Sequence, residues 1–117
     1  MDNETTLSEL KKLVQEFCEA RDWDQFHGPK DLAIGISTEA SEILQHFRFK
    51  SEEESKQLLK DKPEIAEELA DVLYFLLRFS QMYNIDLSEE LENKMKKNDS
   101  KYPVDKVKGL NKKYSEY

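Results

Sequence analysis

Four acidic side chains stand in two pairs with the same spacing of three residues. Glu39 and Glu42 form the first pair, and Glu68 and Asp71 form the second. Side chains three residues apart on a helix are neighbours, so two adjacent helices would bring four carboxylates together. A cluster of carboxylate oxygens without histidine selects a hard cation, Mg²⁺ or Mn²⁺. The spacing therefore predicts a metal site built from these four acids.

The positions of the acids on their helices favour the same interpretation. At ~100° per residue, Glu39 falls inside the apolar stripe of its helix and Glu42 lies on the flank of that stripe. Glu68 and Asp71 lie beside the apolar residues of the next long helix. An unpaired buried carboxylate is costly, and a bound cation removes that cost. An ordinary solvated acidic face stays open as the competing interpretation. A ferritin-like di-iron site does not fit, because neither pair has histidine at its second position.

The spacing of the apolar residues predicts an all-α chain. Thr6 and Asp86 each precede a glutamate by three residues, which is the capping-box pattern of a helix start. The expected helices span about residues 6–22, 29–47, 63–83 and 86–102, and Ser51 is placed to cap a short helix in the connection 47–59. Four helices with short links predict an antiparallel four-helix bundle. We expect one domain over residues 1–117, with a helical core at about 6–102 and a polar, loosely ordered tail at 104–117.

Charge and composition exclude several classes of protein. The net charge is −7, and an acidic chain repels the phosphate backbone of duplex nucleic acid. No apolar run approaches the length that spans a bilayer. The single cysteine, Cys18, allows no internal disulfide, which is typical of an intracellular protein. The expectation is a soluble, cytoplasmic protein that binds neither duplex nucleic acid nor a membrane.

The expected helix at 63–83 is apolar on nearly all of its sides. A helix of this kind has to be covered all round. A four-helix monomer of this length offers little such cover. The pattern therefore predicts a homo-oligomer that buries this helix between subunits.

The acid motif and three flanking segments resemble one known family. Glu39-x-x-Glu42 followed by Glu68-x-x-Asp71 resembles the MazG-like all-α nucleoside triphosphate pyrophosphohydrolases. Segments 21–27, 47–51 and 94–103 are similar to the dCTP pyrophosphatase branch of that superfamily. The resemblance covers roughly residues 6 to 110. It implies Mg²⁺-dependent hydrolysis of a nucleoside triphosphate, dCTP or a related dNTP, to the monophosphate and pyrophosphate. It also implies a homotetramer built as a dimer of dimers, and a role in cleaning the nucleotide pool.

The resemblance also implies roles for single residues. Glu39, Glu42, Glu68 and Asp71 would hold Mg²⁺, or Mn²⁺ as a substitute, and either Glu39 or Glu42 would instead orient or deprotonate the attacking water. The residues that would meet the triphosphate lie on one helix ridge, and those that would surround the base flank the second helix. The first group is Lys94, Asn98 and Tyr102, and the second is Trp23, Phe26, His27 and Phe49. For Trp23 and Phe26 the alternative is core packing, for His27 a capping role, and for Lys94 a solvated surface position.

Two departures from the dCTP-specific relatives put base and sugar preference in doubt. Phe49 stands where those relatives typically have Trp, so the stacking area is smaller. Phe75 stands where they tend to have Tyr, so a hydroxyl next to the sugar is missing unless Tyr74 or another group replaces it. A non-catalytic helical nucleotide-binding or scaffold protein on the same fold is the alternative function.

Overall fold

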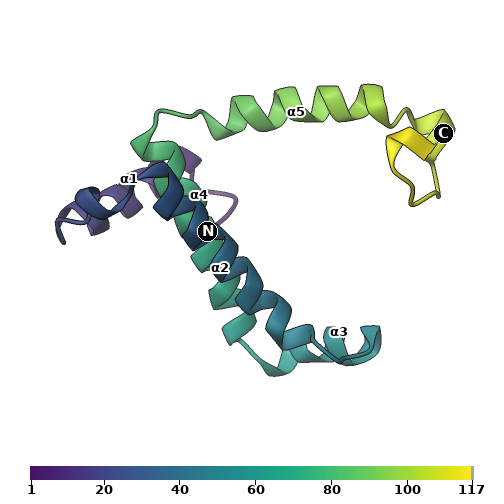
Figure 1. Ribbon diagram of the computed structural model, residues 1–117, viewed down its shortest axis with the longest axis horizontal. Helices are drawn as coiled ribbons and strands as arrows, with labels where there is room; N and C mark the ends of the chain where they lie inside the picture. Colours follow the sequence, from purple (N-terminus) through teal and green to yellow (C-terminus); the bar gives the residue numbers. More distant parts are fainter. Residues whose placement is uncertain (117) are drawn as a thin grey trace. The chain divides into compact units, whose positions relative to one another are not determined.

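The computed structural model describes residues 1–116, and every regular element among them is helical. This confirms the all-α class. Figure 1 shows the order of the elements along the chain. They are α1 (Leu7–Glu19), the 3₁₀ turn η1 (Asp24–Phe26), α2 (Pro29–Phe47), α3 (Glu52–Asp61), α4 (Glu64–Met82), α5 (Leu87–Lys101), α6 (Val104–Val107) and the 3₁₀ turn η2 (Tyr114–Glu116).

Three helices begin at side chains that cap them. Thr6, Ser51 and Asp86 each accept a hydrogen bond from the backbone N–H three residues further on. At Ser51 the box is complete, because the side chain of Glu54 accepts in return from the Ser51 N–H. These contacts satisfy amide donors that have no partner inside the helix. The sequence predicted the starts of α1 and α5 on this basis, and the short helix after Ser51 is α3.

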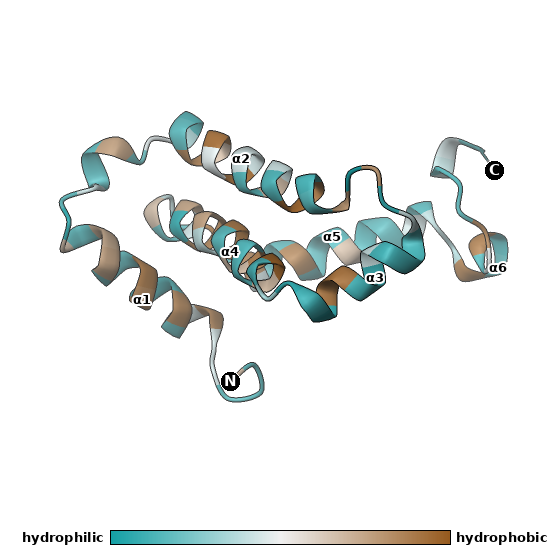
Figure 2. Cartoon of the chain, turned by 90° about the horizontal axis from the view of Figure 1, so that it is seen from below, coloured by the Kyte–Doolittle hydropathy of each residue, from teal (hydrophilic) through white to brown (hydrophobic). Residues whose placement is uncertain are grey.

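The helices α2 and α4 lie side by side and run antiparallel, and α1 packs against α4 (Figures 1 and 2). Gly35 on α2 makes the close approach possible. A Cβ atom at this position would lie 2.4 Å from Cε1 of Phe75 on α4. The apolar side chains buried on α1, α2 and α4 are Val14, Cys18, Leu32, Ile65 and Leu77.

The chain divides into two compact units, residues 1–84 and the segment from Ile85 onward. The first unit holds α1 to α4, and the second holds α5, α6 and η2. The fourth long helix therefore belongs to a different unit from the other three, and the four-helix bundle stays a prediction. The tail at 104–117 was expected to be loosely ordered. Within residues 104–116 it forms α6 and η2, while Tyr117 lies outside the described residues.

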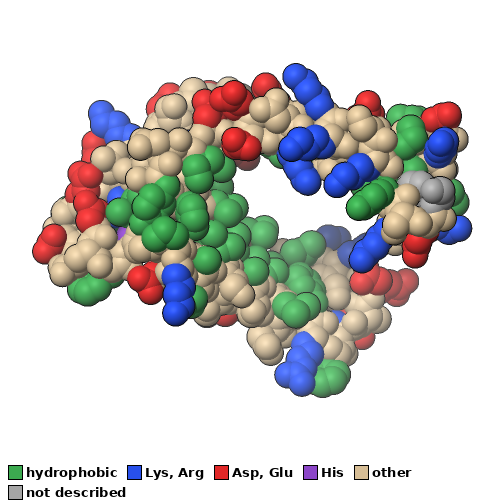
Figure 3. All heavy atoms as spheres, turned by 45° about the horizontal axis from the view of Figure 1, so that its top comes forward, with side chains coloured by type: hydrophobic (Ala, Val, Ile, Leu, Met, Phe, Trp, Pro, Cys, Tyr) green, Lys and Arg blue, Asp and Glu red, His purple; other side chains and the backbone are tan. Residues whose placement is uncertain are grey.

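Much of the apolar surface in the first unit is not covered by the chain itself. On α4, Leu69, Leu73 and Leu76 are exposed, and on α1 so are Leu13 and Phe17. Figure 3 shows apolar side chains gathered on the face that it presents. This agrees with the expectation that α4 needs further cover, although the oligomeric state itself stays a prediction. Over residues 1–116, no helix combines the length and apolar character needed to cross a bilayer.

Candidate active site

The two acid pairs come together where α2 faces α4. Glu39 and Glu42 share a hydrogen bond, and the charges of Asp71 and Glu68 also act on Glu39. Burial is the first cause that raises the pKa of Glu39, followed by the hydrogen bond to Glu42 and the three neighbouring negative charges. Three carboxylates from the two helices thus act on Glu39, so the two acid pairs lie near one another.

Two carboxylate oxygens at this interface are buried without a regular hydrogen bond. They are Oε2 of Glu39 and Oε2 of Glu68. The Glu68 oxygen lies 2.7 Å from Nε2 of His46, an ion-pair contact if the imidazole is protonated. Since buried oxygens are normally satisfied, Oε2 of Glu39 is an atom whose burial a bound cation would offset. The oxygen chemistry fits Mg²⁺ or Mn²⁺.

The acids do not form a closed coordination shell. Across residues 1–116, no three or more His, Cys, Asp or Glu side chains are placed so that together they could hold a metal ion. The four acids thus share one helix interface, and the metal remains a prediction. His46 was not anticipated at this site. Its position four residues after Glu42 on α2 puts it on the same side of the helix, and this is the signal that would have found it.

A second polar cluster ties the segment before α2 to the C-terminal half of α4. Arg78 is buried, with 1% of its surface exposed. Its Nε donates to Nδ1 of His27 at 2.8 Å, its Nη1 donates to Gln81 Oε1 at 2.7 Å, and its Nη2 pairs with Asp24. The hydroxyl of Tyr83 donates to the backbone oxygen of His27 at 2.8 Å. Arg78 was also missed, and its signal is a lone arginine within an apolar helix.

Trp23 and His27, two of the residues expected to surround the base, lie next to each other. Their ring centroids are 6.3 Å apart, edge to face, and Trp23 meets Phe17 in the same way at 5.7 Å. The side chain of Phe26 is 60% exposed, so Phe26 is not packed in the core. The imidazole of His27 therefore has Trp23 on one side and Arg78 at its Nδ1.

Phe49 is not part of this cluster within one chain. It follows the C-terminus of α2, whereas Trp23 and His27 precede the N-terminus. The 19 residues of α2 separate them by roughly 28 Å at about 1.5 Å per residue. Phe49 has a positive φ of 63° and is 89% exposed, with the guanidinium of Arg48 4.7 Å from its ring centre. One chain thus does not assemble the complete predicted base pocket.

Lys94 and Asn98 lie on α5, and Tyr102 is its C-terminal cap residue. They stand four residues apart, so they share one ridge, as the spacing predicted. The ring of Tyr102 meets that of Tyr114 at 6.1 Å. All three belong to the second unit, and their relation to the acids remains a prediction.

The hydroxyl of Tyr74 is engaged with α1. It lies 3.0 Å from Sγ of Cys18, which is fully buried. Burial and this contact raise the pKa of Tyr74 well above its ordinary value. The Tyr74 hydroxyl therefore already has a partner within the chain, and its role next to the sugar stays a prediction.

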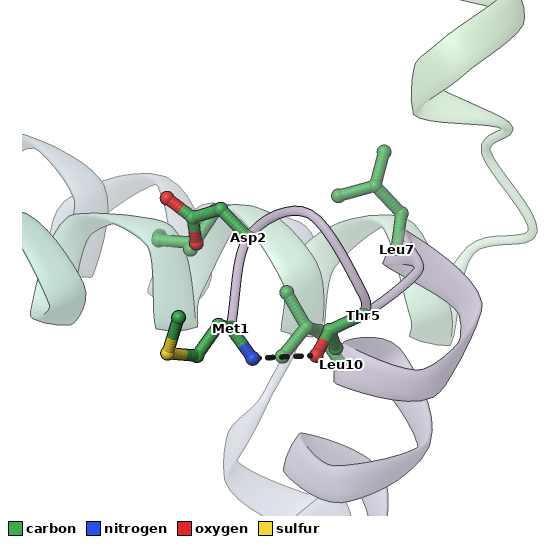
Figure 4. Close-up of a pocket in the computed structure, with 6 residues that line it drawn as sticks. Met1, Asp2, Thr5, Leu7 and Leu10 are labelled. Carbon is green, nitrogen blue, oxygen red and sulfur yellow. Dashed lines mark hydrogen bonds between the residues drawn. The ribbon is translucent and has the colours of Figure 1, made fainter.

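Two open pockets lie away from the acids. One of about 480 Å³ is formed by the N-terminal segment, α1 and α4, and Figure 4 shows its lining. The other, of about 330 Å³, is lined by Leu13, Val14, Phe17 and Tyr74. None of the four acids lines either pocket. Both pockets belong to the exposed apolar surface of α1 and α4.

Comparison with known proteins places the chain in a family. The MazG-like family matches residues 34–117. dCTP pyrophosphatase 1 of Mus musculus is 34% identical over 116 residues, which is 97% of this chain and 68% of that protein. The Homo sapiens protein of the same name is 31% identical over the same shares. The crystal structure of a pyrophosphatase from Archaeoglobus fulgidus superposes with a TM-score of 0.78 and 39% identity, over 83% of this chain and 92% of that one. The chain therefore belongs to the MazG-like family.

Proposed function

We propose that this protein is a Mg²⁺-dependent nucleoside triphosphate pyrophosphohydrolase that cleaves dCTP or a related dNTP to the monophosphate and pyrophosphate. The observation that carries this proposal is the set of four carboxylates between α2 and α4, two of which have a buried oxygen without a regular hydrogen bond. The similarity to proteins named dCTP pyrophosphatase and pyrophosphatase supports it. As a MazG-like protein, the chain is a hydrolase of nucleotide phosphoanhydrides.

The reaction needs a water, a proton acceptor and charge neutralisation. Glu39, Glu42, Glu68 and Asp71 would hold Mg²⁺. When bound there, Mg²⁺ would offset charge on the phosphate oxygens and lower the pKa of the attacking water. Glu39 or Glu42, instead of holding the metal, takes the proton from the attacking water as the water oxygen bonds to the α-phosphorus. The bond between the α- and β-phosphates breaks, and pyrophosphate leaves.

For the base, we propose that Trp23 stacks on it and that His27 hydrogen-bonds it. Lys94, Asn98 and Tyr102 stay the predicted ligands of the triphosphate. Phe49 lies too far from His27 in one chain to reach the same base. If Phe49 contacts the base, it does so from another copy of the chain.

The exposed apolar residues on α1 and α4 support the expectation of a homo-oligomer. We propose a homotetramer, built as a dimer of dimers, in which these faces are buried. Sedimentation equilibrium of the purified protein tests this directly. A monomer at micromolar concentration would contradict it.

The deciding assay is pyrophosphate release from the four dNTPs, dUTP and the four NTPs, with Mg²⁺ and with a chelator. We expect release from dCTP or a related dNTP that the chelator abolishes. Glu39→Gln should reduce kcat at least a hundredfold, on the order of the loss of one preorganised electrostatic group. Glu67→Gln is the matched control, because it removes the same charge from an exposed position next to Glu68. Equal activity of both variants would refute the site.

The alternative of a non-catalytic binding protein is favoured by one observation, the lack of a closed set of three metal ligands in the described chain, residues 1–116. Nucleotide binding without any pyrophosphate release, over all nine nucleotides with Mg²⁺ or Mn²⁺, would establish that alternative.

A further inference from the structure

We propose that Arg78 is a positioning residue that fixes the tautomer of His27, so that His27 presents an Nε2–H donor to the base of the nucleotide. The inference rests on the proposed function, because it takes His27 to face the base. It assigns a role to a buried arginine that hydrolysis of the phosphoanhydride does not otherwise use. It also states which atoms of a base the site recognises, namely hydrogen-bond acceptors.

The first step is the chemistry of the contact. A guanidinium carries only donors and stays protonated in proteins. Nε of Arg78 donates to Nδ1 of His27 at 2.8 Å. Nδ1 must therefore carry its lone pair, and in the neutral ring the proton is on Nε2. An imidazole with its proton on Nδ1 would set two donors against each other.

The second step is that the side chain of Arg78 is held in one orientation. Its side chain is 1% exposed, and Gln81 and Asp24 accept from its two other nitrogens. Breaking one contact would leave a buried charge that is only partly paired, and this is strongly unfavourable. The guanidinium is thus a fixed donor for His27.

The third step is that the ring of His27 is also held from other sides. Tyr83 donates to its backbone oxygen at 2.8 Å, and Trp23 packs edge to face at 6.3 Å. Among the residues that the structure describes, no side chain or backbone group hydrogen-bonds to Nε2. Since the side chain is only partly buried, this nitrogen is available to a ligand.

The fourth step is the charge state. The pKa of His27 is lowered by burial and, second, by the positive charge of Arg78, while Asp24 and Asp31 act in the opposite direction. The ring is therefore neutral near pH 7, with one bare and one protonated nitrogen. In this fixed neutral tautomer, Nε2 presents a hydrogen-bond donor and not an acceptor.

The consequence concerns the substrate. An Nε2–H donor pairs with a carbonyl oxygen or an unprotonated ring nitrogen of a base. The opposite tautomer would present an acceptor to the same atom and leave both without a partner. Sites that hydrogen-bond a substrate atom discriminate strongly against a mismatch. Arg78 thereby sets a selectivity that His27 alone would not have.

The test uses NMR of the imidazole nitrogens in the full chain, which has only two histidines. In the wild type we expect an unprotonated, hydrogen-bonded Nδ1 and a proton on Nε2 for His27. In Arg78→Met, the Nδ1–H tautomer should become populated and the pKa of His27 should rise, because the positive charge is lost. Gln81→Leu is the matched control, since it removes a partner of Arg78 but no contact of His27. His46 serves as an internal reference, because it lies near Glu68, ten residues away from Arg78 along α4.

Kinetics provide the second measurement. Arg78→Lys keeps the charge but not the planar donor, and it should raise KM for the preferred dNTP about fivefold with kcat little changed, as expected when one hydrogen bond to the substrate is weakened. A protonated Nδ1 in the wild-type protein at neutral pH would overturn the proposal without any variant. An altered tautomer with an unchanged KM would overturn the role in base binding. If the wild type releases no pyrophosphate, the proposed function fails, while the NMR result still decides whether Arg78 sets the tautomer.

Discussion

Replacing Gly35 with alanine is expected to push α2 away from α4 and so to disturb both the fold and the acid cluster. The added Cβ would lie 2.4 Å, 2.6 Å and 2.7 Å from three ring carbons of Phe75. Carbon atoms pack at about 3.5–4.0 Å, so roughly 1 Å of additional separation is needed. Phe75 cannot give way freely, because Tyr74 packs edge to face against it at 5.0 Å and is itself tied to Cys18.

The expected cost follows from two opposing effects. Overpacking of this size costs about 1–3 kcal/mol. Alanine has a helix propensity better than glycine by about 1 kcal/mol, which offsets part of it. The net loss in the free energy of unfolding is about 0–2 kcal/mol. For a unit the size of residues 1–84, this corresponds to a fall in Tm of up to about 15 °C.

The assay is thermal unfolding at matched chain concentration for the wild type, Gly35→Ala, Phe75→Leu and the double variant. Because leucine lacks the ring that meets the new methyl group, the double variant should recover part of the loss. The cycle isolates the contact between the two positions. The activity of Gly35→Ala should fall by more than the loss of folded protein alone would explain. Glu39 is one helical turn from Gly35, and a displacement on the order of 1 Å costs about a hundredfold in rate.

The sign of the change in the free energy of unfolding distinguishes a close contact at Gly35 from an exposed helical position. At an exposed helical position, glycine to alanine stabilises by about 0.4–1 kcal/mol. A Gly35→Ala variant that is more stable than the wild type, and equally active, would show that α2 and α4 do not approach closely at Phe75. The proposed geometry of the acids would then lose its structural basis.

Three further predictions concern ligand linkage, pH and one buried contact. Mg²⁺ at a hundredfold excess over its Kd should stabilise the wild type by about 2.7 kcal/mol, and Glu39→Gln should lose most of this gain; equal stabilisation of both proteins would count against the metal site. The pKa of His27 is lowered in the folded protein, so between that value and about 6.5 the unfolded chain binds the extra proton. Stability should therefore decrease as pH falls through this window and be unaffected above it, and urea unfolding of His27→Gln should show a flatter pH dependence than the wild type. Tyr74→Phe removes the partner of Cys18 and should cost about 1 kcal/mol, whereas an unchanged melting curve would mean that the hydroxyl contributes nothing.

The helix boundaries were the most predictable part of the fold, because local chemistry sets them. Pro29 and the apolar periodicity gave α2 with both ends as observed, and Thr6 and Asp86 marked the starts of α1 and α5. The helix after Ser51 was anticipated only as an option, since a capping pattern does not by itself say whether a short polar segment folds. Helical periodicity predicts that α5 is a helix, but it carries no information about which surface α5 packs against.

The acid cluster was predictable for a related reason. Two pairs of acids lie beside the apolar stripes of neighbouring helices, and the charge of Asp71 on α4 acts on Glu39 on α2 in the structure. The contacts of Arg78 and His46 depend instead on long side chains that bridge elements far apart in sequence. Phe49 shows what a resemblance to a family leaves open. A resemblance groups residues by role, but it does not say whether one chain or two supply them.

The capping contacts at Thr6, Ser51 and Asp86 also bear on how the chain folds. Each joins residues only three apart, so the contact itself involves no distant part of the chain. Pairing α2 with α4 is different, because it closes a loop that includes α3. The entropy of closing a flexible loop grows by only about 0.6 kcal/mol for each doubling of its length. A tag or reporter inserted in the connection between α2 and α4 should therefore add little to the entropy of loop closure, while one added methyl group at Gly35 would act directly on the contact between the two helices.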